Sequence, residues 1–160
     1  METTRSKRTI AARGLVVLSA ILYCVSLTRN SFCVPNGCTG WPAWGVLLMG
    51  WIEPVALGQV GPFVAFSWYA NPCAAAAWIL ALTSNRRLAV ISASTALLLG
   101  LAFLAGKVVL VSEGGVPYQI TGYAAGYWIW IASLTVTLGA AVVCPTPAVN
   151  AQASGSVGVA

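Results

Sequence analysis

The scarcity of charged side chains constrains this chain more than any other feature of its sequence. Of its 160 residues, 59% are hydrophobic and 7% are charged, whereas about 25% of the residues in soluble proteins carry a charge. The acidic residues are Glu2, Glu53 and Glu113, and the sequence contains neither Asp nor His. A domain in water could not cover its surface with so few charges. The composition therefore excludes an ordinary soluble protein and indicates a multi-pass membrane protein.

The same scarcity excludes several classes of enzyme. Without His or Asp, the chain can form no Ser-His-Asp or Cys-His-Asp triad, no His-ligated metal site and no aspartyl-phosphate. We therefore predict no catalytic residue, no metal and no cofactor, and a protein that is not an enzyme.

Three stretches are apolar and long enough to be transmembrane helices, since a spanning helix needs about 20 mostly apolar residues. They cover about residues 14–29, 88–107 and 126–144. The region between residues 41 and 83 is harder to assign, because its first half contains several Pro and Gly residues together with Glu53. This region could hold one span or two.

Basic residues decide between the two topologies, because Lys and Arg gather in the cytoplasmic loops of membrane proteins. The basic residues near the N-terminus and in the turn before the third apolar stretch are Arg5, Lys7, Arg8, Arg13, Arg86 and Arg87. Both groups can be cytoplasmic only if the chain crosses once between residues 30 and 86. We therefore predict a second span over about residues 60–83, and an interfacial or re-entrant helix over about residues 41–58 on the outer side.

The predicted fold is an all-α membrane protein: a four-transmembrane-helix bundle with an extra-cytoplasmic interfacial helix and an outer loop cap. We expect residues 1–13 to be a basic cytoplasmic tail, residues 14–144 to be one membrane domain and residues 145–160 to be a disordered tail. Both termini are then cytoplasmic. The first span could instead be a signal peptide, but no A-x-A site follows it, which favours an uncleaved anchor. The apolar alternation between Val108 and Tyr123 allows a short outer hairpin.

Two cysteines, Cys33 and Cys38, lie in the sequence CVPNGC on the predicted outer side. The Pro-Asn-Gly sequence between them favours a turn that brings the two sulfurs together. A disulfide closing so short a loop stabilises the fold by about 2 kcal/mol. We predict a structural disulfide, and a redox-active pair or two free thiols are the alternatives.

Three polar or aromatic residues form a candidate intramembrane or interfacial site: Glu53, Trp68 and Asn71. Glu53 either faces water from an interfacial helix or binds a proton or cation inside the membrane, where a carboxylate costs about 2.5–3.5 kcal/mol. Pro72 has no amide hydrogen, so it leaves the carbonyl of Trp68 without its helical donor and predicts a kink. The region around Trp68 and Asn71 is either a packing kink or a niche for a ligand or lipid.

Small residues recur at four-residue spacing in the third and fourth spans. Such residues let helix backbones approach closely in a membrane. The two predicted packing faces are Ser92, Ala96 and Gly100, and Ser133, Thr137 and Ala141. They can pack within the bundle or against a partner.

Aromatic residues gather toward the predicted outer side. The residues concerned are Trp41, Trp44, Trp51, Tyr118, Tyr123, Tyr127, Trp128 and Trp130. Trp and Tyr are common at the interfaces of a bilayer with water. They indicate either an interfacial belt or an outer docking surface.

Two sequence motifs, WYANP near the second span and ITGYAAGYWIWIAS before and within the fourth, give the chain a resemblance to known proteins. It resembles small bacterial integral membrane proteins of uncharacterised function that carry similar motifs. The resemblance covers roughly residues 68–133. It implies a four-helix protein of the bacterial inner membrane, and it transfers no catalytic residue.

Two hypotheses about function follow from these features. The first is a non-catalytic multi-pass inner-membrane protein that acts through helix packing and its outer aromatic surface, as an accessory subunit or by binding another membrane protein. The second is a small transporter, or a thiol- or quinone-linked membrane enzyme, that uses Glu53 or the Cys33–Cys38 pair. We favour the first. The expected partners are the lipid bilayer and other membrane protein subunits or further copies of the chain, and no nucleic acid is expected.

Overall fold

The protein is mostly helical, and four of its helical segments are long and apolar enough to cross a membrane. The computed structural model describes residues 2–35, 37–38, 42–110 and 116–145. The four long segments are Thr3–Leu27, Pro62–Leu82, Arg86–Ala105 and Ala125–Val143. They overlap the four ranges that the sequence predicts. The segment predicted as a disordered tail lies outside the described residues beyond residue 145.

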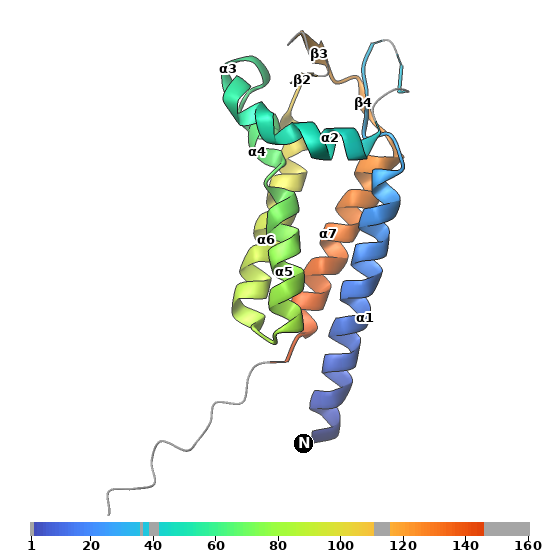
Figure 1. Cartoon of the computed structure of the whole chain (residues 1–160), viewed down its shortest axis with the longest axis vertical. Coiled ribbons are helices and arrows are strands. Elements are labelled where there is room, and N and C mark those ends of the chain that lie inside the picture. The colour runs from blue at the N-terminus through green and yellow to red at the C-terminus, as the bar shows by residue number, and fades with distance from the viewer. Residues whose placement is uncertain (1, 36, 39–41, 111–115, 146–160) are drawn as a thin grey trace, which may run out of the picture.

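The long helices pack in two pairs, and the two pairs are in contact with each other. Helix α1 (Glu2–Leu27) runs along α7 (Ala125–Val143), and α5 (Ala70–Leu82) runs along α6 (Arg86–Ala102). Contacts between α6 and α7 join the pairs. The N-terminus, the turn between α5 and α6, and the end of α7 all lie toward the same end of the molecule (Figure 1).

Helix α1 begins twelve residues before the predicted first span, at Glu2. The sequence from Glu2 to Arg13 contains neither Gly nor Pro and includes several good helix formers. The helix therefore continues through the basic segment, which is a helical extension where a separate tail over residues 1–13 was expected. Arg5, Lys7 and Arg8 are exposed on this extension.

Small residues line the contacts between the long helices. The buried members of α5 and α6 recur every three or four residues: Ala70, Ala74, Ala77 and Ala81, and Ala89, Ala93, Ala96 and Gly100. A Cβ atom on Gly100 would lie 2.8 Å from the Leu134 side chain of α7. Side chains this small let neighbouring helices approach closely.

Both predicted small-residue faces therefore pack between helices of the same chain. Ala96, Gly100, Ser133, Thr137 and Ala141 are buried. Ser92 is half-buried, and its hydroxyl donates to the carbonyl of Cys73 on the neighbouring α5 at 2.7 Å. These residues hold the helices of one chain together.

The region predicted as an interfacial or re-entrant helix forms three short helices in place of a span. They are α2 (Ala43–Met49), the 3₁₀ helix η1 (Gly50–Ala56) and α3 (Leu57–Val60). Helix α2 runs across one end of the long helices, opposite the N-terminus (Figure 1). Chain direction reverses at Gly61, whose φ of 77° favours glycine, and α4 (Pro62–Ser67) then enters the bundle.

Short strands lie at the same end of the molecule, within a fold that is mostly helical, as the predicted all-α class implies. Strand β1 (Phe32–Cys33) pairs antiparallel with β4 (Gly122–Tyr123). Strand β2 (Val108–Leu110) pairs antiparallel with β3 (Pro117–Gln119), which forms the short hairpin that the sequence allows between Val108 and Tyr123. Such strands arise because the segments between the helices satisfy part of their backbone hydrogen bonding with each other.

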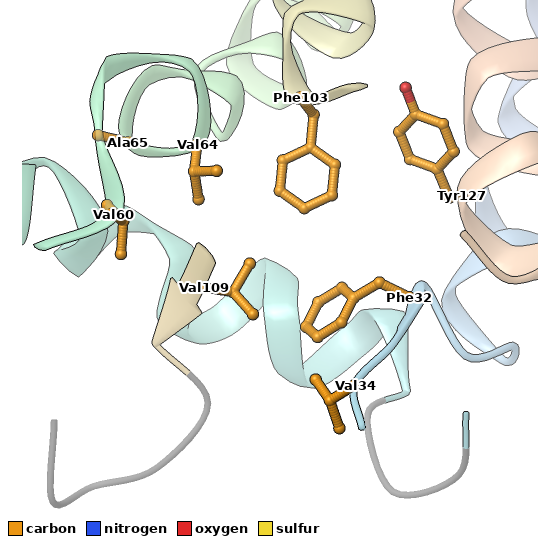
Figure 2. Close-up of a cluster of buried hydrophobic side chains, with 8 residues drawn as sticks. All are labelled: Phe32, Val34, Val60, Val64, Ala65, Phe103, Val109 and Tyr127. Atoms are coloured by element: carbon orange, nitrogen blue, oxygen red, sulfur yellow. The ribbon is translucent and has the colours of Figure 1, made fainter. Parts of the chain in front are cut away.

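A cluster of buried side chains joins these outer segments to the ends of the long helices (Figure 2). We call it the outer core, and it consists of Phe32, Val34, Val60, Val64, Ala65, Phe103, Val109 and Tyr127. Phe103 belongs to the 3₁₀ helix η2 (Phe103–Ala105), and its ring lies 5.8 Å from that of Tyr127 on α7. The strands, the short helices and the helix ends therefore share one hydrophobic core.

The first turn of α7 lies close against the backbone that follows α1, at Gly126. Its amide donates to the carbonyl of Asn30 at 2.9 Å. A Cβ atom here would lie 2.6 Å from the Asn30 carbonyl oxygen and 2.9 Å from that of Arg29. Only glycine fits this contact without moving the backbone of one partner.

We predict that Gly126→Ala lowers the free energy of unfolding by about 1–3 kcal/mol, the usual effect of overpacking. Gly139→Ala is the control, because Gly139 lies in the same helix and has no other atom within 4 Å of an added Cβ. The control should leave stability unchanged or slightly raised, since Ala is the better helix former. Unfolding of both variants in mixed detergent micelles measures this difference, and equal stability would contradict the close contact.

Candidate functional site

The break between α4 and α5 is the starting point of the site. As predicted, Pro72 cannot supply the amide that would pair with the carbonyl of Trp68, and the helix is interrupted at Trp68 and Tyr69. Asn71 repairs the loss: its backbone amide and its side-chain Nδ2 each lie 3.0 Å from the Trp68 carbonyl oxygen and donate to it. The kink therefore fixes the orientation of the Asn71 side chain.

The amide oxygen of Asn71 joins three helices. It accepts a hydrogen bond from the Tyr23 hydroxyl of α1 at 3.0 Å and another from Trp130 Nε1 of α7 at 3.1 Å. An amide oxygen has two lone pairs, so both are used here. A single uncharged side chain therefore sets the position of α5 relative to α1 and α7.

Trp68 connects the same break to the short helices outside the bundle. Its Nε1 donates to the carbonyl of Leu47 on α2 at 2.7 Å. Its ring lies against Gly50, where a Cβ atom would be 2.6 Å from Cδ1 of the indole. Trp68 thus holds the end of α2 and the start of η1 against the bundle.

A cavity of about 70 Å³ lies between these residues and α2. Its lining comes from α1, β1, α2, α4, α5, η2 and α7 and from the residues next to them. The lining residues are Tyr23, Ser26, Leu27, Ser31, Phe32, Ala43, Val46, Leu47, Gly50, Ser67, Trp68, Asn71, Phe103, Gly126, Tyr127 and Trp130. Trp68 and Asn71, which the sequence groups as a candidate niche, thus lie together in its wall.

The third residue of that candidate site cannot be placed with them. Glu53 belongs to η1, and its side chain lies outside the part of the structure that is described. The cavity wall also contains residues that the sequence analysis did not single out, among them Tyr23, Ser31 and Phe103. Tyr23 carried a usable signal, because a hydroxyl near the end of an apolar helix needs a hydrogen-bond partner.

A second polar network lies nearer the middle of the bundle. Trp78 Nε1 of α5 is 3.1 Å from the hydroxyl of Ser19 on α1 and 3.0 Å from that of Thr137 on α7. The two hydroxyls are 2.7 Å apart, and the carbonyl of Ser133 accepts from both at 2.9 Å. Thr137 and Ser133 were predicted as packing residues. They also supply the polar contacts that join α1, α5 and α7.

The predicted outer aromatic residues divide into two groups. Trp44, Trp51 and Trp128 are more than half exposed, at 55%, 57% and 52%. Tyr118, Tyr123 and Trp130 are half-buried, Tyr127 is 3% exposed, and Trp41 lies outside the described residues. Tyr127 is therefore not part of a surface, because its ring packs in the outer core and its hydroxyl donates to the carbonyl of Gly100 at 3.0 Å.

Tyr123 is also bound to the outer core through a hydrogen bond of its hydroxyl. Its hydroxyl donates to the carbonyl of Phe103 at 3.1 Å. Burial raises the pKa of this hydroxyl above its ordinary value of 10.0. The group therefore stays protonated at neutral pH and remains a hydrogen-bond donor.

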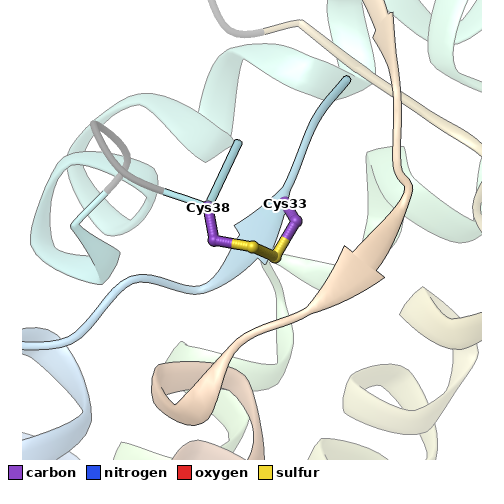
Figure 3. Close-up of a disulfide and its surroundings, with 2 residues drawn as sticks. All are labelled: Cys33 and Cys38. Atoms are coloured by element: carbon purple, nitrogen blue, oxygen red, sulfur yellow. A yellow bond between two sulfur atoms is a disulfide. The ribbon is translucent and has the colours of Figure 1, made fainter. Parts of the chain in front are cut away.

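The disulfide between Cys33 and Cys38 is formed, as predicted (Figure 3). It closes a turn in which the backbones of Val34 and Gly37 exchange two hydrogen bonds, at 3.0 and 2.8 Å. Gly37 has a φ of 123°, which favours glycine at this position. Cys33 belongs to β1, so the bridge fastens the loop after β1 to the strand that pairs with β4.

Comparisons of the chain with known protein families, with curated proteins and with solved structures found no match. The interpretation of the site therefore rests on its own geometry.

We predict a graded loss of stability when the Asn71 contacts are removed. Tyr23→Phe deletes one hydrogen bond and should lower the free energy of unfolding by about 0.6 kcal/mol, the average for such bonds in membranes. Asn71→Leu deletes the bonds with Tyr23, Trp130 and Trp68 and should cost about 1–2 kcal/mol. Unfolding by SDS in mixed micelles measures both.

Thr95→Val is the matched control. Thr95 is exposed on α6, and its side chain has no hydrogen bond within the described part of the chain, so this change should have no effect. If Asn71→Leu proved no less stable than Tyr23→Phe, Asn71 would not be the residue that joins the three helices.

Proposed function

We propose that the chain is a multi-pass protein of the bacterial inner membrane with both termini in the cytoplasm. The four long apolar helices support the membrane location. The basic residues support the orientation, because those of the α1 extension and the exposed Arg86 and Arg87 lie at the same end of the molecule (Figure 1). The opposite end carries the Cys33–Cys38 disulfide, which suits an oxidising compartment.

Within that membrane, the protein acts by binding another membrane protein, as an accessory subunit of a complex or as a regulator of its partner, and not by catalysis. The observation that carries this proposal is a row of exposed apolar side chains on α2 and η1. We call this row the cap stripe. It consists of Trp44, Leu48, Trp51 and Val55, which are 55%, 61%, 57% and 85% exposed.

Trp44 and Leu48 are four residues apart in α2, which places them on one face of that helix. Trp51 and Val55 continue the exposed row along the 3₁₀ helix η1. The opposite face is already occupied, because Leu47 and Gly50 contact Trp68 of the bundle. A helix that lies on a bilayer surface normally carries a strongly polar or charged face. The segment from Ala43 to Val55 has one charged residue, Glu53, and two apolar faces.

The exposed apolar face of this segment is more stable against a protein partner than in contact with water. Exposed apolar patches of this kind mark interaction sites, and Trp is among the residues that contribute most to binding at interfaces. The structure of the cap stripe therefore favours the docking surface over the simple interfacial belt as the role of Trp44 and Trp51.

We predict that the double variant Trp44→Ala and Trp51→Ala releases the protein from its complex. After extraction in a mild detergent, the wild type should migrate on native gels as a larger assembly, and the variant as a single chain. Leu98→Ala is the control: Leu98 is 68% exposed on α6, away from the cap stripe, and its removal should not change the native size. A wild type that migrates alone would contradict the proposal.

The orientation is tested by cysteine labelling in intact cells. The background for this test replaces the three free cysteines with alanine: Cys24, Cys73 and Cys144. After reduction with a membrane-impermeant phosphine, Cys38 should react with an impermeant maleimide.

The control chain lacks Cys33 and Cys38 and carries Asn85→Cys, at the turn between α5 and α6. It should be labelled only after the membrane is permeabilised. The reverse pattern would invert the proposed topology and leave the four spans untouched.

A further inference from the structure

We infer that the cavity beneath α2 binds the acyl-ester end of a membrane lipid. This inference rests on the proposed membrane location. The cavity lies at the level of the last turn of α1, where Tyr23 and Ser26 line it, and of the first turn of α7, where Tyr127 lines it. In a bilayer, the ends of spanning helices lie near the boundary between hydrocarbon and headgroups, which is where the ester groups of lipids are found.

The chemistry of the lining selects an uncharged group with a hydrogen-bond acceptor. None of the described residues in the wall carries a charge at neutral pH. The hydroxyls of Ser26 and Ser67 donate to carbonyls of their own helices, at 2.6 and 2.7 Å. By contrast, the Ser31 hydroxyl has no hydrogen bond within the described residues, although Ser31 is only 9% exposed.

Asn71 adds a second donor to the cavity wall. Its Nδ2 carries two hydrogens, and only the bond to the Trp68 carbonyl uses one within the described structure. A carbonyl oxygen that entered the cavity could therefore accept from Ser31, from Asn71 or from both. The aromatic rings of Phe32 and Phe103 give the rest of the wall an apolar character suited to a methylene chain.

The size of the cavity excludes a whole drug-sized ligand. Its volume of about 70 Å³ is less than half of the roughly 150 Å³ that holds one benzene in an engineered cavity. The cavity is partly open, so it can take the end of a longer molecule. The helices that form it expose apolar side chains outside, at Val25, Met49 and Phe66, so the remainder of that molecule is an apolar chain.

Water alone is a poorer occupant. A water molecule needs about 10–15 Å³ of such volume and about three hydrogen bonds, so filling the cavity would take several molecules. Each would need polar partners, and much of the wall is apolar or already paired. A single carbonyl oxygen can accept from the unused donors of Ser31 and Asn71. The apolar chain that carries it fills the space beside the aromatic rings of the wall.

The test compares an ester lipid with its ether analogue by native mass spectrometry of the detergent-purified protein. The probes are 1-monooleoyl glycerol and 1-O-oleyl glycerol, which differ chiefly in the carbonyl. We expect the wild type to bind one ester molecule, and to bind the ether about threefold to tenfold more weakly, the effect of one neutral hydrogen bond. Ser31→Ala should reduce ester binding by a similar factor and remove most of the preference.

A second pair of variants tests the location. Ala43→Leu places three more carbons at the cavity wall and should abolish binding. Ala75→Leu makes the same change at an exposed position of α5 and should not. If Ala43→Leu fails to fold, Ser31→Ala decides, because the Ser31 hydroxyl has no hydrogen bond within the described residues and its loss should leave the fold intact.

Four outcomes would overturn the inference. They are no ester binding by the wild type, equal binding of ester and ether, an unchanged ester preference in Ser31→Ala, or equal binding by the Ala43→Leu and Ala75→Leu variants when both fold. None of these outcomes bears on membrane location or on the cap stripe. Membrane location is tested by extraction of the protein from membranes, and the cap stripe is tested by the native size of the protein.

Discussion

The unpaired carbonyl that Pro72 creates at Trp68 is the constraint on which the centre of this structure depends. An apolar environment offers no replacement donor, and a buried carbonyl without one costs several kcal/mol. Asn71 supplies two donors, and the side chain is thereby held with its oxygen toward α1 and α7. Tyr23 and Trp130 then donate to that oxygen. The interruption of one helix at Trp68 therefore leads to hydrogen bonds that join three helices.

The same break connects the bundle to the segments outside it. Because the helix is interrupted at Trp68, the indole reaches α2 and donates to the carbonyl of Leu47, while Gly50 makes room for its ring. The outer core and the Cys33–Cys38 bridge hold the remaining outer segments to the helix ends. The short helices and strands therefore form a structured cap, and the cavity lies where this cap meets the bundle.

Hydropathy and basic residues predicted the four long helices, because both signals are local and the membrane imposes a fixed length. They also predicted that residues 41–58 do not form a span, although as one helix where the structure has three short ones. The disulfide was also predictable from the turn residues between its cysteines, and the hairpin from the alternation of apolar residues along its strands. The partners of Asn71 and Trp78 were not, because they depend on how each helix is rotated about its axis. Tyr127 shows the same limit: an aromatic residue near the end of a span looks like an interfacial anchor, and only packing against Phe103 places it in the core.

Helix α2 is shared by the two proposed sites. Leu47 of α2 lines the cavity, whereas Trp44 and Leu48 of the same helix belong to the cap stripe. The adjoining η1 contributes Gly50 to the cavity and Trp51 to the stripe. A lipid that alters the position of α2 must therefore alter the geometry of the stripe. Thermodynamic linkage makes such coupling reciprocal: the factor by which the lipid changes affinity for a partner is the factor by which the partner changes affinity for the lipid. A protein with so few ionisable groups can in this way respond to its membrane through packing and neutral hydrogen bonds alone.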